Sequence, residues 1–167
     1  MKPMSASESE STAAEPGPVH VIVHGKASGF LQEVTAGQHH LQVDEPVSVG
    51  GSNAAPDPYD YLLSALGACT SMTVGLYARK KKWPLDEVTV KLRHSHIHAK
   101  DCADCETKDG MLDHVALEIT LEGALTDEQR ATLMKVAQKC PVHRTLTSEI
   151  AIEMRMAPMP PPVPPIS

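Results

Sequence analysis

Aromatic side chains are scarce in this 167-residue chain, in which Phe, Trp and Tyr together make up 3% of the residues. The hydrophobic core must therefore be built from aliphatic side chains and methionine. The chain also lacks a basic run long enough to follow a phosphate backbone, and its formal net charge is -6. Because nucleic-acid binding depends on clustered lysine and arginine, a nucleic-acid partner is disfavoured.

The first ten residues contain serine and glutamate but no apolar segment of the kind found in secretory signals. An uncharged segment at 61–78 precedes four basic residues, and its length is at the lower limit for a membrane span. Serine, threonine and glycine within it lower its hydrophobicity, so we expect a buried helix and no membrane partner. With four cysteines and no export signal, we expect a cytoplasmic protein whose thiols serve redox chemistry or metal binding.

Proline marks both ends of the chain. Three of the fourteen prolines lie in the first eighteen residues, and six lie between Pro158 and Pro165. We therefore expect a disordered arm rich in Ser and Glu at 1–18, one domain at 19–156 and a disordered proline-rich tail at 157–167.

Hydrophobic periodicity predicts the elements of the domain. Strands are expected at 19–25, 30–35 and 38–43, a helix at 58–82, strands at 88–98 and 115–121, a helix from the capping box of Thr126 to Pro141, and a final strand at 150–156. This order predicts an α+β fold, because a parallel α/β sheet would need strands and helices in regular alternation.

Two cysteines lie on the apolar faces of the two predicted helices. One buried cysteine is more often an inert small hydrophobic residue, but Cys69 and Cys140 lie on faces that could meet and support thiol redox chemistry. Cys140 is expected at a helix C-terminus, where the dipole opposes a negative charge, so we assign attack to Cys69 and resolution to Cys140. Candidate cations beside the thiolate are Lys26, His143 and Arg144. The alternatives are a solvated turn residue for Lys26 and a surface or dimer contact for Arg144.

A second cluster of possible ligands lies at 94–106. Its three histidines share one face of a predicted strand, and its two cysteines have the Cys-x-x-Cys spacing of a zinc knuckle. The candidate zinc ligands are His96, His98, Cys102 and Cys105. The two cysteines could instead form a local disulfide or remain exposed thiols. This cluster supports an alternative function, a non-enzymatic metal- or redox-sensing module at 94–105.

Three motifs resemble the OsmC/Ohr family, and are closest to its OsmC-like branch: GSNAAPDPYDYLL at 51–63, ALGACT at 65–70 and KCPVHRTL at 139–146. The resemblance covers nearly all of residues 19–156. It implies an intertwined α+β homodimer in which antiparallel sheets wrap around a central buried helix.

The resemblance also implies a thiol-dependent peroxidase that reduces organic hydroperoxides in oxidative-stress defence and requires no cofactor. In such a mechanism Cys69 becomes a sulfenic acid and then forms a disulfide with Cys140, which a dithiol such as a lipoyl group reduces. An apolar funnel around Cys69 would favour alkyl hydroperoxides, and we assign Leu66, Met72 and Tyr59 to its wall.

The chain departs from the peroxidase pattern at two positions. Lys26 stands in the first inter-strand turn, where the best-studied members have arginine. Tyr59 stands ten residues before the first cysteine, where they have glutamate, and Asp60 lies beside it. Lys26 and Asp60 are therefore candidates for a substitute activating pair, with Arg144 as a third orienting group.

Overall fold

The computed structural model describes residues 20–102, 107 and 109–158. They form two compact units that divide between Pro58 and Tyr59. The predicted arm at 1–18 and all but the first two residues of the predicted tail at 157–167 lie outside the described residues.

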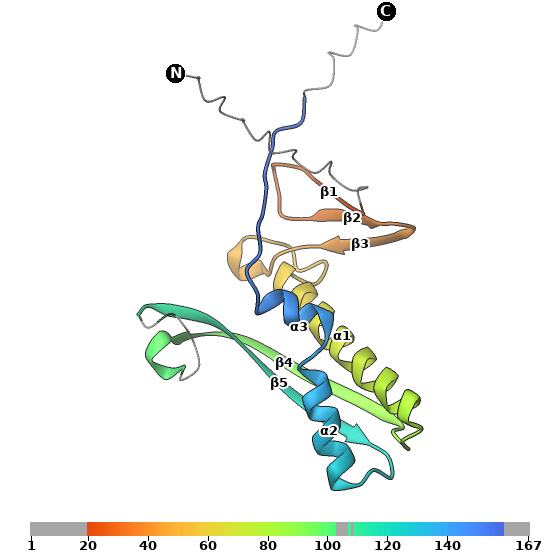
Figure 1. The fold of residues 1–167 in the computed structure, drawn as a ribbon. Helices are drawn as coiled ribbons and strands as arrows, with labels where there is room; N and C mark the ends of the chain where they lie inside the picture. The colour runs from red at the N-terminus through yellow and green to blue at the C-terminus, as the bar shows by residue number, and fades with distance from the viewer. Residues whose placement is uncertain (1–19, 103–106, 108, 159–167) are drawn as a thin grey trace, which may run out of the picture. The chain divides into compact units, whose positions relative to one another are not determined.

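The first unit contains a three-stranded antiparallel sheet in the order β1-β2-β3 (Figure 1). Its strands are β1 (Val21–Gly25), β2 (Gln32–Ala36) and β3 (His39–Val43). The tight turn between β2 and β3 contains Gly37 at φ 61, a left-handed conformation that glycine adopts without steric cost. The three strands and the hairpin at this turn are confirmed.

A buried carboxylate organises the loop that follows β3 and the short helix η1 (Val47–Val49). Asp44 is 2% exposed, and its Oδ2 accepts hydrogen bonds from the Ser52 amide at 3.0 Å, the Ser52 hydroxyl at 2.6 Å and the Ala54 amide at 3.0 Å. The Ala54 amide, followed by the Ser52 hydroxyl, lowers the pKa of Asp44 to about 2. Asp44 therefore holds in place the loop that leads to the long helix.

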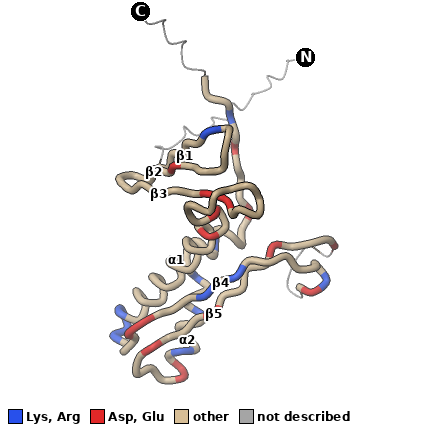
Figure 2. The backbone as a smooth tube through the Cα atoms, turned by 180° about the vertical axis from the view of Figure 1, so that it is seen from behind, with Lys and Arg blue, Asp and Glu red and all other residues tan. Residues whose placement is uncertain are grey.

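The second unit places three helices beside a two-stranded antiparallel ribbon (Figure 1). Its elements are α1 (Pro58–Lys81), β4 (Glu87–His98), η2 (Ala99–Asp101), β5 (Met111–Glu122), α2 (Asp127–Ala137) and α3 (Pro141–Leu146). Proline suits the first turn of α1, and basic residues gather in its last turn, where they complement the helix dipole (Figure 2). The predicted capping box of Thr126 and Gln129 opens α2.

The core of this unit lies where α1, α2 and β5 meet. Val74 and Ala78 from α1 pack with Leu121 from β5 and with Leu133 and Ala137 from α2. The core residues are aliphatic, as the shortage of aromatics predicts, although Tyr77 and Trp83 pack at its edge. The mixed fold with antiparallel sheets confirms the predicted α+β class.

Two predictions for the C-terminal part are wrong. Helix α2 ends at Ala137, and Pro141 begins α3 instead of only stopping the preceding helix. Residues 150–156 form no strand in the single chain (Figure 1), and Ile152, Met154 and Met156 are 79%, 90% and 95% exposed. The alternating pattern is present, but no described strand of the chain pairs with it.

Helix α1 is long and apolar enough to cross a membrane by length and composition, with a mean hydropathy of 1.3 over its best window. Core helices of soluble proteins meet the same criterion. In the single chain 28% of that window is buried, on the side that carries Leu66, Val74 and Ala78. The predicted burial of the whole helix is therefore not seen in the single chain, where Met72 is 71% exposed.

Candidate active site

The structure brings the two predicted redox cysteines together. Cys69 lies in the middle of α1 and is half-buried, whereas Cys140 lies between α2 and α3 and is 0% exposed. Both are free thiols. The hydroxyl of Thr70, the residue after Cys69, lies 3.4 Å from the sulfur of Cys140, and the Cys69 side chain is one of the groups that lower the pKa of Cys140. The two cysteines are therefore neighbours in the fold, and Cys69 is the one that solvent can reach.

The surroundings of Cys140 differ from the expected helix C-terminus. Cys140 is the N-cap of α3, and its Sγ accepts a hydrogen bond from the backbone amide of His143 at 3.2 Å. The hydroxyl of Thr70 lies 3.4 Å from the same sulfur. The predicted position of Cys140 at a helix C-terminus, with a dipole that disfavours charge, is therefore wrong, because α2 ends three residues earlier and α3 begins here.

These contacts change the acidity of Cys140. Burial of the sulfur alone would raise the pKa of this thiol. Hydrogen bonds from the Thr70 hydroxyl, the His143 amide and the Cys69 side chain outweigh that effect and hold the pKa below its ordinary value. The site therefore favours the thiolate form of the buried Cys140.

A cavity of about 250 Å³ is lined by two residues that contact Cys140, although neither Cys69 nor Cys140 itself belongs to the lining. Thr70 and His143 connect it to Cys140, and its apolar wall comes from both the ribbon and α2. The lining side chains are Thr70, Leu117, Ile119, Met134, Ala137, Gln138 and His143. None of the residues predicted to bind substrate belongs to this lining: Leu66 is buried at 3% exposure, Met72 is 71% exposed, and Tyr59 stacks on the His94 ring.

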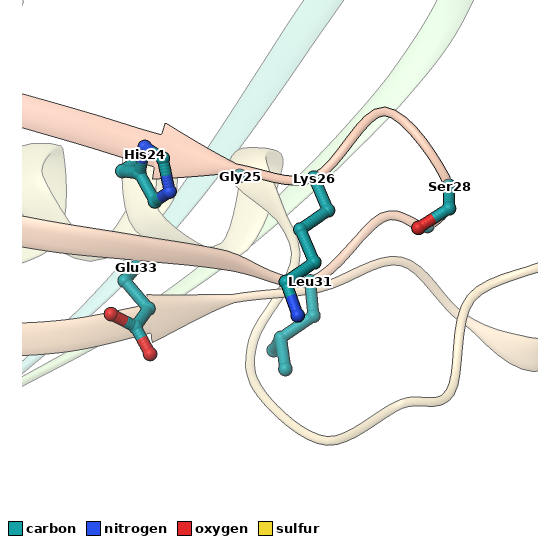
Figure 3. A pocket seen from close by; sticks show the side chains of 7 residues that line it. His24, Gly25, Lys26, Ser28, Leu31 and Glu33 are labelled. Carbon is teal, nitrogen blue, oxygen red and sulfur yellow. The ribbon is translucent and has the colours of Figure 1, made fainter. Parts of the chain in front are cut away.

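Lys26 lines a separate hollow of about 390 Å³ within the first unit. Figure 3 shows its side chain extending from the turn after β1 toward Leu31, with Glu33 on the neighbouring strand. Because Lys26 belongs to the first unit and Cys69 to the second, an activating role for Lys26 stays a prediction.

The other two candidate orienting residues belong to the second unit. Asp60 lies in the first turn of α1, nine residues before Cys69, which is about 13 Å along a helix axis. Arg144 is exposed on α3, four residues after Cys140, and its backbone amide donates to the Cys140 carbonyl at 3.1 Å. Their roles likewise stay predictions.

The proposed zinc ligands are only partly described. His96 and His98 lie on β4. Cys102 is disulfide-bonded and offers no thiolate, so its prediction as a zinc ligand is wrong, and Cys105 lies outside the described residues. In the part of the chain that the structure describes, the ligand atoms that converge are those of His94, His96 and Asp113.

Sequence reasoning missed Thr70 and Asp113. Thr70 follows Cys69 directly. A polar residue on the buried side of a helix needs a hydrogen-bond partner, and this could have pointed to Thr70. Asp113 could be found only through the register of β4 and β5, in which it pairs with His96.

The chain matches the family profile described as OsmC-like protein over residues 50–155. It belongs to this family, which confirms the OsmC/Ohr resemblance. A comparison with curated protein sequences found no match.

Three solved structures illustrate the shared fold. A protein from Psychrobacter arcticus is 20% identical, with a TM-score of 0.63 over 80% of this chain and 91% of that one. An organic hydroperoxide resistance protein OsmC from Legionella pneumophila is 23% identical, with a TM-score of 0.57 over 81% and 92%. The organic hydroperoxide resistance protein OhrB of Bacillus subtilis is 17% identical, with a TM-score of 0.53 over 76% and 88%. At these identities the likeness establishes the fold.

Proposed function

We propose that this protein is a cytoplasmic, homodimeric thiol peroxidase that reduces organic hydroperoxides and requires no cofactor. The observation that carries the proposal is the placement of Cys140 against the turn of α1 that carries Cys69, where the Thr70 hydroxyl lies 3.4 Å from the Cys140 sulfur. A half-buried thiol beside a fully buried one is the arrangement that a peroxidatic and a resolving cysteine need. Structural relatives described as organic hydroperoxide resistance proteins agree with this substrate class.

In the first step the sulfur of Cys69 attacks one oxygen of the hydroperoxide. The O–O bond breaks, the thiol is oxidised to a sulfenic acid, and the alkoxide takes up the thiol proton and leaves as an alcohol. Cys69 has this role because it is the more exposed sulfur. Lys26, Asp60 and Arg144 are the candidates for orienting the thiolate and the peroxide.

In the second step the sulfur of Cys140 attacks the sulfur of the Cys69 sulfenic acid. An S–S bond forms and hydroxide leaves, which becomes water on protonation. The hydrogen bonds that lower the pKa of Cys140 favour this step, because the thiolate is the attacking species. An external dithiol, such as a lipoyl group, then reduces the disulfide by two thiol exchanges.

The apolar cavity supports a preference for organic substrates. Leu117, Ile119 and Met134 line it, and each methylene buried there would contribute about 0.8 kcal/mol to binding. Hydrogen peroxide has no such group, so the cavity would discriminate against it.

The test is steady-state reduction of cumene hydroperoxide with a lipoyl dithiol as electron donor. We expect turnover by the wild type and only the uncatalysed rate with Cys69→Ser. Cys140→Ser should consume one equivalent of peroxide and accumulate a sulfenic acid on Cys69, detected by dimedone labelling and mass spectrometry.

Cys102→Ser is the comparison variant: it changes a cysteine outside this pair and opens the disulfide that Cys102 forms. Equal peroxide consumption by the wild type and Cys69→Ser would refute the proposal. Loss of function in Cys102→Ser alone would favour the alternative sensing module at 94–105.

A further inference from the structure

Two histidines of β4 converge on one carboxylate oxygen of β5. The Nε2 atom of His94 lies 2.8 Å from Oδ1 of Asp113, and the Nε2 atom of His96 lies 3.2 Å from the same oxygen. The three ligand atoms all lie within 4.8 Å of one another. This cluster is separate from the cysteine pair, since neither cysteine belongs to it.

The strand register produces this convergence. Residues two apart on a strand point to the same face, so His94 and His96 project together from β4. Asp113 is the register partner of His96 on β5 and lies diagonally opposite His94. The antiparallel ribbon therefore supplies all three groups from one face.

The cluster is held on one side and open on the other. The ring of His94 stacks on Tyr59 at 4.4 Å between centroids and 16° between planes, and its side chain is 18% exposed. The side chains of His96 and Asp113 are 62% and 68% exposed. His94 is therefore fixed in orientation, whereas His96 and Asp113 can adjust to a ligand that arrives from solution.

We propose that His94, His96 and Asp113 bind a divalent transition-metal ion of the zinc class. Two imidazole nitrogens and one carboxylate oxygen are ligands that such ions take in proteins, and water would fill the remaining positions. Ligand atoms about 2.1 Å from a tetrahedral zinc ion lie roughly 3.4 Å apart. The 3.2 Å separation of His96 and Asp113 is close to this value, whereas the 2.8 Å separation of His94 and Asp113 is that of a hydrogen bond, which an ion would replace.

This ligand set differs from the one predicted from the sequence. It shares His96 with that set, but His94 and Asp113 replace His98 and the two cysteines. The proposal does not depend on peroxidase activity, because the metal cluster and the cysteine pair are different sites. Tyr59, whose ring stacks on His94, lies on α1 ten residues before Cys69, which is about 15 Å along the helix.

The test is zinc binding to the chelator-treated full chain, measured by isothermal titration calorimetry. The background is Cys69→Ser with Cys140→Ser, because free thiolates would compete for the metal. We expect one ion to bind per chain and Asp113→Asn to weaken binding at least roughly tenfold. His94→Gln should have a similar effect.

Two control variants separate this site from its neighbours. His114→Gln removes the histidine next to Asp113, which points toward Ser95 on the other face of the ribbon, and should leave the affinity unchanged. His98→Gln tests the set predicted from the sequence and should also bind as the background does. Affinity that is lost in His98→Gln but kept in Asp113→Asn would overturn the proposal.

A second measurement needs no substitution in the metal site, so it does not depend on whether the variants fold: the NMR signals of the histidine rings are recorded in the background protein with and without zinc. Added zinc should shift the ring signals of His94 and His96 and leave those of His114 in place. An unchanged spectrum at saturating zinc would also refute the proposal.

Discussion

The hydroxyl oxygen of Thr70 lies 3.4 Å from the sulfur of Cys140, although seventy positions separate the two residues in the chain. Thr70 is 1% exposed, so water cannot replace this contact. Because a thiolate only accepts hydrogen bonds, the hydroxyl must donate once Cys140 is ionised. Thr70, on the helix that carries Cys69, therefore stabilises the thiolate form of Cys140.

Replacing Thr70 with valine should raise the pKa of Cys140. The substitution keeps the shape of the side chain and removes the hydroxyl that stabilises the thiolate. The thiolate absorbance at 240 nm, followed against pH in a Cys69→Ser background, measures the change. Disulfide formation after a peroxide pulse, measured with Cys69 present, should also become slower.

The control for this prediction is Thr73→Val in the same helix. The Thr73 hydroxyl donates to the Cys69 carbonyl at 2.7 Å, so the variant loses a half-buried hydroxyl without losing a contact to Cys140. Identical titration curves for Thr70→Val and its background would contradict the role of Thr70.

Asp44 should make stability depend on pH in the acid range. Its pKa is lowered from 3.8 to about 2, so the carboxylate stabilises the folded state above about pH 4. This stabilisation is lost as the pH falls from 4 toward 2, because the carboxyl group becomes protonated. Asp44→Asn should lower stability at neutral pH and flatten the dependence between pH 4 and pH 2.

Urea unfolding at several pH values between 2 and 6 measures this effect. Glu33→Gln is the matched control, because it removes an exposed carboxylate from the same unit. A slope that is the same in Asp44→Asn and in the wild type would show that Asp44 does not carry the acid sensitivity.

Local signals predicted most of the elements correctly. The capping box at Thr126, the turn at Gly37 and the start of α1 at Pro58 depend on neighbouring residues, which the sequence shows directly. Pro141 illustrates the limit of such signals, since proline both ends one helix and suits the first turn of the next. Only the structure shows that Cys140 caps a new helix.

Contacts across the chain were harder to predict. The pairing of Thr70 with Cys140 depends on how α1 packs beside the segment between α2 and α3. The convergence on Asp113 depends on a strand register that alternation alone leaves open. Both require tertiary structure. The two cysteines were found because the pattern of apolar residues placed them on the faces of two predicted helices, although Cys140 lies just outside α2 and α3.

Gly67 should be intolerant of a side chain. A Cβ atom there would lie 2.7 Å from Cδ1 of Leu92, because α1 and β4 approach closely at this point. Gly67→Ala should therefore destabilise the protein by about 1 to 3 kcal/mol, measured by urea unfolding. The matched control is Gly75→Ala in the same helix, whose nearest neighbour is the flexible end of Arg79 at 3.3 Å.

Gly75→Ala should be neutral or more stable by up to about 1 kcal/mol, because alanine favours the helix. Equal effects of the two substitutions would show that the approach of Leu92 does not limit position 67.

The segment at 150–156 should pair with a second copy of the chain. Its apolar side chains alternate as in a strand, yet Ile152 and Met154 are 79% and 90% exposed. Exposed apolar residues also occur on β1, where Val21, Ile22 and Val23 are 55–59% exposed. Surfaces of this kind are unfavourable in water, and a dimer in which they are covered would remove the cost.

Size-exclusion chromatography with light scattering tests this pairing. The wild type should be a dimer at micromolar concentration, and Ile152→Asp with Met154→Asp should shift it toward monomer. Ala151→Asp is the control, because it places the same charge on the opposite face of the segment. If the wild type is a monomer, or if Ala151→Asp dissociates the dimer as completely as the double variant does, the alternating apolar face does not form the interface.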